Sequence, residues 1–170
     1  MSASRAGRTE PRKRPPALSL ALQRGDGIAA LPASRAQLRR WVAAAIDADA
    51  ALTLRFVGEA EGRQLNHAYR GRDYPTNVLS FVYALSAEDM APGAPGLPEV
   101  VADIVICLPV LEREARERNI PLAHHLAHLV IHGVLHACGH DHEHDEPAQI
   151  MQALETRLLG RFRIPDPYQG

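Results

Sequence analysis

The sequence predicts a mixed α/β domain in which a small sheet is covered by helices on both faces, a three-layer sandwich. Short alternating apolar segments typical of strands are separated by segments with helical spacing, and the first half gives the order strand, helix, strand, helix. The composition of the 170 residues, 46% apolar and 23% charged, suits one globular domain. It excludes a collagen, a coiled-coil rod and a wholly disordered chain.

Residues 1–16 are expected to form a disordered basic arm, since they combine Arg, Ser and Pro without apolar periodicity and lack the apolar core of a secretory signal. The arm holds five of the 19 basic residues, so the rest of the chain carries 14 basic and 19 acidic residues. A domain with this net negative charge has no general attraction to nucleic acid, and any contact with RNA requires a local basic patch. The domain itself is expected over residues 17–168.

The first half contains two predicted strands and two predicted helices. Residues 17–23 and 52–56 alternate between apolar and polar side chains, as half-buried strands do. Ser34 is a candidate cap for the first helix. Apolar residues recur there at helical spacing: Leu38, Trp41, Val42, Ala45 and Ile46. The second helix is expected over residues 59–69, ending before Arg70 and Gly71.

The second half begins with a bend at Pro75 and a strand from Val78. Residues 84–99 are rich in Pro and Gly and predict a long loop, which in a compact domain is often functional. The strand from Val100 is almost continuously apolar and should lie centrally. Helices are expected over 112–118, 122–138 and about 147–159, and the last has an apolar stripe of Ile150, Leu154 and Leu158.

Membrane insertion and a disulfide framework are both excluded by the pattern. No stretch reaches the roughly 18 uninterrupted apolar residues of a spanning helix. The two cysteines, Cys107 and Cys138, stand in apolar surroundings and are too few for a disulfide framework. We therefore expect a cytoplasmic protein.

Histidine is unusually clustered, because eight of the nine histidines lie between His124 and His144. His132 and His136 are four residues apart in a helical context, so both rings leave the same face and can share a metal ion. A catalytic zinc takes three protein ligands and keeps one position open for water. Gly139 lets the chain turn back, so His140, His142 or His144 could supply the third ligand. We favour His142, giving one Zn²⁺ per chain.

Two neighbouring residues are less suitable as ligands. His128 lies on the same helical face, but His128 and His136 are separated by about 12 Å of helix axis, too far to share one ion. Its side chain is expected beside the site or in the core. Cys138 follows His136 by two residues and is therefore turned away from the metal face, toward the core.

A glycine, Gly133, occupies the position where the HExxH helix of zinc peptidases carries its general base. Either the metal activates water without that carboxylate, or another acid such as Asp141 or Asp103 assists. For Asp141 we favour a role as a turn residue or as a partner of a ligand. Gly133 therefore argues against the hypothesis that the chain is a metallopeptidase or amidohydrolase. That hypothesis is kept as an alternative function.

Three separate motifs resemble one known family. The string HGVLHACGHDH (132–142) resembles the HGxLHLxGYDH signature of the YbeY family of bacterial rRNA-maturation endoribonucleases. YRGRDYPTNVLSF (69–81) resembles the YRGKDxPTDVLSF segment of that family, and ADIVIC (102–107) resembles its GDIxIC strand. The resemblance runs from about Ala17 to Tyr168. The departures, at His140, Ala137 and Ala102, affect no ligand position, although His140 adds an imidazole near the site.

This resemblance implies a single-domain, zinc-dependent, single-strand-specific endoribonuclease that acts in small-subunit rRNA processing and ribosome quality control. His132, His136 and His142 match the metal ligands, and Arg70 matches the arginine in the RNA cleft. The implied partners are single-stranded RNA, the ribosomal small subunit and its assembly factors. A non-enzymatic assembly factor whose metal is structural is a further alternative.

The residues themselves are compatible with this chemistry. Hydrolysis of a phosphodiester needs a metal ion and positive charge to neutralise the transition state. Arg70 and Arg72 precede the strand from Val78 and offer fork-shaped phosphate donors, of which we favour Arg70. Asn77 and Ser80 could line the same cleft, or serve only the strand.

Overall fold

The computed structural model describes residues 14–84, 97–140 and 144–169, and these contain one mixed sheet. The strands are β1 (Leu18–Arg24), β2 (Ala50–Val57), β3 (Val78–Val82) and β4 (Val100–Cys107), in the spatial order β1-β2-β4-β3. The β1, β2 and β4 strands are parallel, and β3 runs antiparallel at the edge beside β4. The strand from Val100 is therefore central, as predicted.

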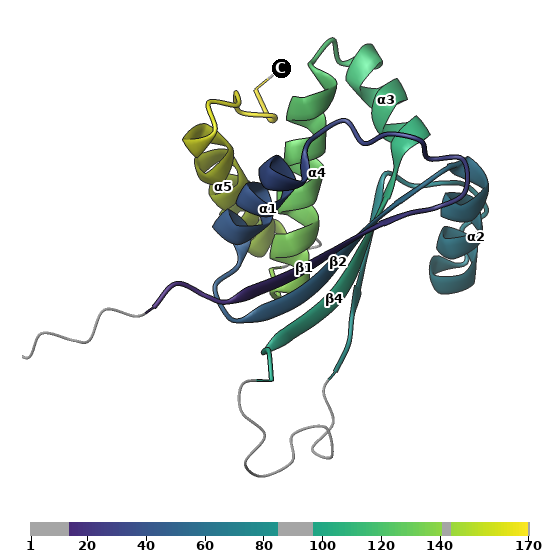
Figure 1. Ribbon diagram of the computed structural model, residues 1–170. Helices are drawn as coiled ribbons and strands as arrows, with labels where there is room; N and C mark the ends of the chain where they lie inside the picture. The colour runs from purple at the N-terminus through teal and green to yellow at the C-terminus, as the bar shows by residue number, and fades with distance from the viewer. Residues whose placement is uncertain (1–13, 85–96, 141–143, 170) are drawn as a thin grey trace, which may run out of the picture.

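Helices lie on both sides of this sheet, which confirms the predicted three-layer α/β class. They are α1 (Arg35–Ala45), α2 (Glu59–Arg70), α3 (Leu108–Glu117), α4 (Leu122–Ala137) and α5 (Asp145–Arg161). In Figure 1, α1, α4 and α5 gather on one side of the sheet and α2 lies on the other. The described helices include none long and apolar enough to cross a bilayer.

The core is divided by the sheet because side chains alternate between its faces. Leu54, Phe56, Ile104 and Ile106 belong to the larger cluster, which also includes the buried faces of α1, α4 and α5. A smaller cluster occupies the α2 face: Val57, Leu79, Val105, Cys107 and Val110. The α2 helix covers only part of this second face.

Local signals determine several helix ends as expected. The Ser34 side chain accepts a hydrogen bond from the backbone of Gln37, whose own side chain returns to the Ser34 backbone, completing a capping box at α1. Gly71 ends α2 in a left-handed conformation with φ +67°, which a glycine adopts without strain. Both ends were predicted from the residue types.

Two predictions in the second half need correction. The α3 helix begins at Leu108, not at residue 112, because Pro109 fits in the first helical turn and Leu108, Val110 and Leu111 are buried. In α5 the predicted stripe is partly wrong, since Ile150 is exposed. The buried face consists of Met151, Glu155, Leu158 and Leu159.

Some predicted features fall outside the described residues. These are most of the basic arm (1–13), most of the loop (85–96), and the segment 141–143, which includes Asp141 and His142.

Candidate metal centre

The α4 helix carries the histidine cluster through the middle of the protein. It packs against β3 and β4, and against α1, α3 and α5, which explains why it is apolar almost all round. Its histidines therefore project from a largely buried helix, whose position beside the sheet is seen in Figure 1.

Gly133 allows α4 to approach the sheet closely. A Cβ atom at this position would lie 2.8 Å from Cγ2 of Ile104 and 3.3 Å from Cγ2 of Val78. The Ser80 hydroxyl donates a hydrogen bond of 3.1 Å to the Gly133 carbonyl and ties β3 to the helix. The residue after His132 therefore faces the sheet, where no glutamate side chain fits.

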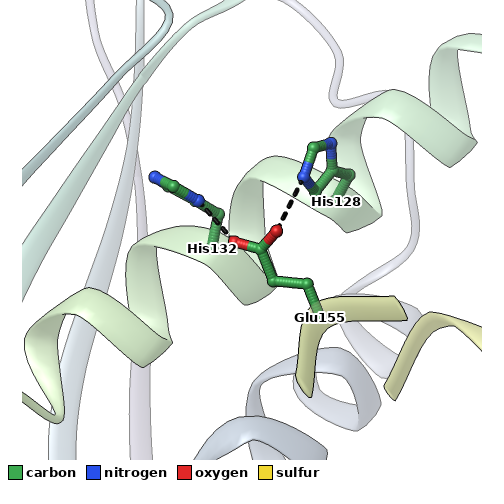
Figure 2. Close-up of side chains that lie close together, drawn as sticks. All are labelled: His128, His132 and Glu155. Atoms are coloured by element: carbon green, nitrogen blue, oxygen red, sulfur yellow. Dashed lines mark hydrogen bonds and ion pairs between the residues drawn. The ribbon is translucent and has the colours of Figure 1, made fainter. Parts of the chain in front are cut away.

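His132 is oriented by a buried carboxylate from α5. Its Nδ1 lies 2.5 Å from Oε1 of Glu155, and Nε2 of His128 lies 3.2 Å from Oε2 of the same residue (Figure 2). The Tyr168 hydroxyl also donates to Glu155. Because a carboxylate only accepts, the Nδ1–H of His132 is the donor, so the tautomer of the neutral ring compatible with this contact has its lone pair on Nε2. This is the tautomer of a histidine that binds metal through Nε2.

Glu155 is ionised in this setting. Burial disfavours its charge, but hydrogen bonds from His128, His132 and Tyr168 outweigh burial and lower its pKa to about 2. Burial and the Glu155 carboxylate raise the pKa of Tyr168. The Tyr168 hydroxyl therefore keeps its proton and donates it in the hydrogen bond, so all three hydrogen bonds of this network are donated to the Glu155 carboxylate.

His136 is oriented in the same way by a backbone carbonyl. The Gly139 N–H bonds to the His136 carbonyl and the His140 N–H to the Leu135 carbonyl, a Schellman motif with Gly139 at φ +100°. The turn brings the His140 carbonyl to 2.9 Å from Nδ1 of His136. A carbonyl only accepts, so Nδ1 of His136 carries a proton, and the compatible tautomer of the neutral ring has its lone pair on Nε2. His140 acts on this ring through its backbone.

A small pocket of about 110 Å³ brings Arg70 together with the two histidines. Its wall includes Arg70, Asn77, Ser80, His132 and His136. The His132 and His136 ring centroids are 6.4 Å apart. Arg70 is exposed and has no ion-pair partner among the described residues. The pocket therefore combines two oriented imidazoles with an uncompensated guanidinium.

The segment between α2 and β3 is held by buried polar groups. The Asn66 side chain is 1% exposed and donates a 2.6 Å hydrogen bond to the Tyr74 carbonyl. Further along, the Asn77 side chain donates to Glu114 at 3.1 Å, and Nε2 of His125 lies 2.7 Å from the same carboxylate. These contacts tie the segment to α3 and α4, so the wall opposite the histidines has a defined position.

The other sequence candidates have different positions. Arg72 bonds to the Tyr74 hydroxyl at 2.9 Å and does not line the pocket. Asp103 projects from the α2 face of β4, where it accepts from the Tyr83 hydroxyl, and is also not part of the pocket. Cys138 is half-buried against the main core, as predicted.

His128, His132 and Glu155 offer ligand atoms within 4.8 Å of one another and could themselves hold an ion. Zinc ligands about 2 Å from a tetrahedral ion lie roughly 3.3 Å apart. The 2.5 Å separation between His132 and Glu155 is that of a hydrogen bond. In this geometry, Glu155 therefore accepts a hydrogen bond from the candidate ligand His132. His128 lines a separate pocket from the one that His132 and His136 line.

Comparison with known proteins identifies the family of the chain. Residues 30–163 match the family model described as Endoribonuclease YbeY. The chain belongs to the YbeY family. An Endoribonuclease YbeY of Cupriavidus pinatubonensis is 54% identical over 158 residues, covering 91% of this chain and 74% of that protein. One from Thiobacillus denitrificans is 50% identical, covering 91% of this chain and 99% of that protein.

A solution structure from Thermotoga maritima aligns with 89% of this chain and 99% of its own, with 25% identity and a TM-score of 0.48. The predicted family is thus confirmed by the family model and by these YbeY relatives.

Sequence reasoning did not identify Glu155 or Tyr168 as parts of the site. One signal was present, because Glu155 follows Met151 by four residues and precedes Leu159 by four, which places a carboxylate on the buried face of α5. A charged residue on a buried face is almost always paired. Tyr168, beyond the last helix, offered no comparable signal.

Proposed function

We propose that this protein is a metal-dependent endoribonuclease that cleaves single-stranded RNA. The observation that carries the proposal is the pocket in which Arg70 faces the same space as His132 and His136. Two imidazoles oriented through Nδ1 suit a metal ion, and an exposed guanidinium with no ion pair to the described part of the chain suits a phosphate. The names of the relatives, each an endoribonuclease, support the same chemistry.

One zinc ion is the proposed cofactor, held by His132, His136 and His142. The donor set fits the ion, because both described rings place the proton on Nδ1 and the lone pair on Nε2. His142 lies outside the described residues, so its place in the set rests on the motif. When bound, the ion would polarise a phosphoryl oxygen and lower the pKa of a bound water.

Arg70 is the proposed catalytic residue. Its guanidinium can donate two parallel hydrogen bonds to the non-bridging oxygens of the scissile phosphate and neutralise the charge that develops there. Asn77 and Ser80 hold the wall between Arg70 and α4 through their bonds to Glu114 and Gly133. Glu155 and the His140 carbonyl keep the two imidazoles oriented.

By family resemblance we further propose that the substrate is rRNA, that the protein acts with the ribosomal small subunit and its assembly factors, and that it works in the cytoplasm. These proposals depend on the family rather than on any described surface.

A peptidase using the same ion is disfavoured by Gly133. The position of the HExxH glutamate packs on Ile104 and Val78, where even a Cβ atom would lie only 2.8 Å from Cγ2 of Ile104. A general base on this helix position is therefore not available to the chain.

The decisive experiment measures metal content and cleavage of a short, end-labelled unpaired RNA for the wild type and for Arg70→Ala. We expect Arg70→Ala to keep its metal and lose about 100-fold or more in cleavage rate. Arg72→Ala is the matched control, because Arg72 lies outside the pocket, and it should cleave like the wild type. His136→Ala should lose both metal and cleavage.

Three results would contradict the proposal. Zinc-loaded wild type could leave the unpaired RNA intact, it could cleave a peptide library instead, or Arg70→Ala could cleave at the wild-type rate. A perfectly paired duplex of the same sequence serves as the test of single-strand preference, and its equal cleavage would contradict that part.

A further inference from the structure

A larger groove adjoins the metal pocket on the α2 face of the sheet. Its cavity volume is about 560 Å³, within the range of small-molecule sites. Arg70 and Ser80 line both cavities, so the groove begins where the proposed phosphate contact lies. We call it the aromatic groove, after Tyr69, Phe81 and Tyr83 in its wall.

The aromatic rings of this groove remain open to water. Tyr69, in the last turn of α2, is 67% exposed, and Tyr83, directly after β3, is 51% exposed. Tyr69 packs edge-on against Phe81 with ring centroids 4.6 Å apart. The Tyr83 hydroxyl donates to Asp103 at 2.5 Å, which anchors that ring to the neighbouring strand β4. Large rings held in place yet exposed are typical of binding surfaces.

The charged side chains of the aromatic groove other than Arg70 are held by partners within its wall. Arg55 forms a 2.7 Å ion pair with Glu61, and Asp103 accepts a hydrogen bond from the neutral hydroxyl of Tyr83. Leu79 and Val105 add apolar surface. Arg70, at the junction with the metal pocket, is the cation of the groove without an ion pair among the described residues. The groove thus suits a neutral planar group attached to an anion at Arg70.

We propose that the aromatic groove binds the unpaired base next to the scissile phosphate, stacked on Tyr69 and Tyr83. This inference rests on the proposed function, since it assumes an RNA phosphate at Arg70. Aromatic platforms bind bases of any sequence through their faces. Those faces are available only when the base is unstacked from its own strand, so the groove would select single-stranded RNA.

The test is a binding cycle between protein and RNA variants. Metal-stripped protein is titrated by fluorescence anisotropy with a short unpaired RNA and with copies that lack one base beside the scissile phosphate. Tyr69→Leu keeps an apolar side chain over Phe81 but removes the platform. We expect it to bind the intact RNA about five- to 150-fold more weakly. Tyr69→Phe should bind like the wild type.

The cycle separates stacking from a general loss of affinity. Wild type should bind the base-deleted RNA at least as weakly as Tyr69→Leu binds the intact one, because the deletion also removes the contact with Tyr83. Tyr69→Leu combined with the base deletion should cost little more than the base deletion alone. Tyr74→Leu is the matched control, because Tyr74 is 50% exposed but lies outside the groove, and it should not alter binding. In steady-state cleavage, Tyr69→Leu should raise KM more than it lowers kcat.

Other outcomes overturn the inference. If Tyr69→Leu and Tyr83→Leu both bind RNA like the wild type, or if protein change and base deletion act independently, the groove does not stack the base. Cleavage by the wild type in that case would leave the proposed function intact. If the wild type neither binds nor cleaves RNA, the proposed function falls as well.

Discussion

Nδ1 of His132 on α4 lies 2.5 Å from Oε1 of Glu155 on α5, in the interior of the protein. Glu155 is fully buried and also accepts from His128 and Tyr168. The carboxylate therefore links the candidate metal centre to the last helix and to the C-terminal segment. Partners of this type typically contribute 10- to 100-fold to metal affinity.

Glu155→Gln should weaken zinc binding by about 10- to 100-fold while the protein stays folded, because the amide keeps the shape but loses the charge that polarises His132. Competition with a chromogenic chelator measures the affinity, and circular dichroism checks the fold. Glu146→Gln, at an exposed position of the same helix, should bind zinc like the wild type. Unchanged zinc affinity in Glu155→Gln would show that the contact between Glu155 and His132 does not contribute to metal binding.

Gly133→Ala should destabilise the protein by about 1–3 kcal/mol, since the new Cβ would lie 2.8 Å from Ile104 and overpack the contact between α4 and β4. Gly160→Ala is a matched control on α5, because no atom outside its own helix lies within 4 Å of that Cβ. It should be neutral or stabilising by up to about 1 kcal/mol. Urea unfolding compares the two, and equal effects would contradict the close packing at Gly133.

Stability should fall in acid through His125, which is 2% exposed. Burial lowers its pKa below 6.5, although the nearby Glu114 opposes this. Below pH 6.5 the unfolded chain takes up a proton that the folded protein does not, so this contribution is complete above pH 6.5 and lost as the pH decreases.

The measurement is urea unfolding of metal-free protein between about pH 7.5 and pH 5.5, with a contribution of at most about 1.4 kcal/mol per pH unit from this residue. His125→Gln should make the decline shallower. The neighbouring His124→Gln, at a less buried position, should retain the wild-type slope. Parallel curves for all three proteins would contradict the assignment to His125.

Removal of the metal should leave a folded protein. The main core joins the sheet to α1, α4 and α5 through apolar contacts that need no ion. Metal should add only the stabilisation that ligand binding gives to the folded state, about 2.7 kcal/mol at 100 times the dissociation constant. Circular dichroism and thermal unfolding after chelation measure this. Loss of the helical signal on chelation would instead support a structural metal.

Much of the architecture followed from local patterns. The alternation in β1 and β2, the capping residues of α1 and the glycine that ends α2 each act within a few residues, and the structure agrees with them. The start of α3 was missed because Leu108 and Pro109 suit the end of an apolar strand as well as the first turn of a helix. Only packing against the sheet distinguishes the two.

The amino-acid pattern was sufficient to predict the family and the pair of histidines that one helical turn places on the same face, because helix geometry depends on near neighbours alone. The groups that surround this pair depend on how the helices and strands pack together. Glu155 and Arg70 are distant from His132 along the chain, and they reach it only because α5 packs on α4 and because Gly133 lets α4 lie against the edge strand beside α2. Such neighbours arise from the packing of whole elements, which no local spacing records.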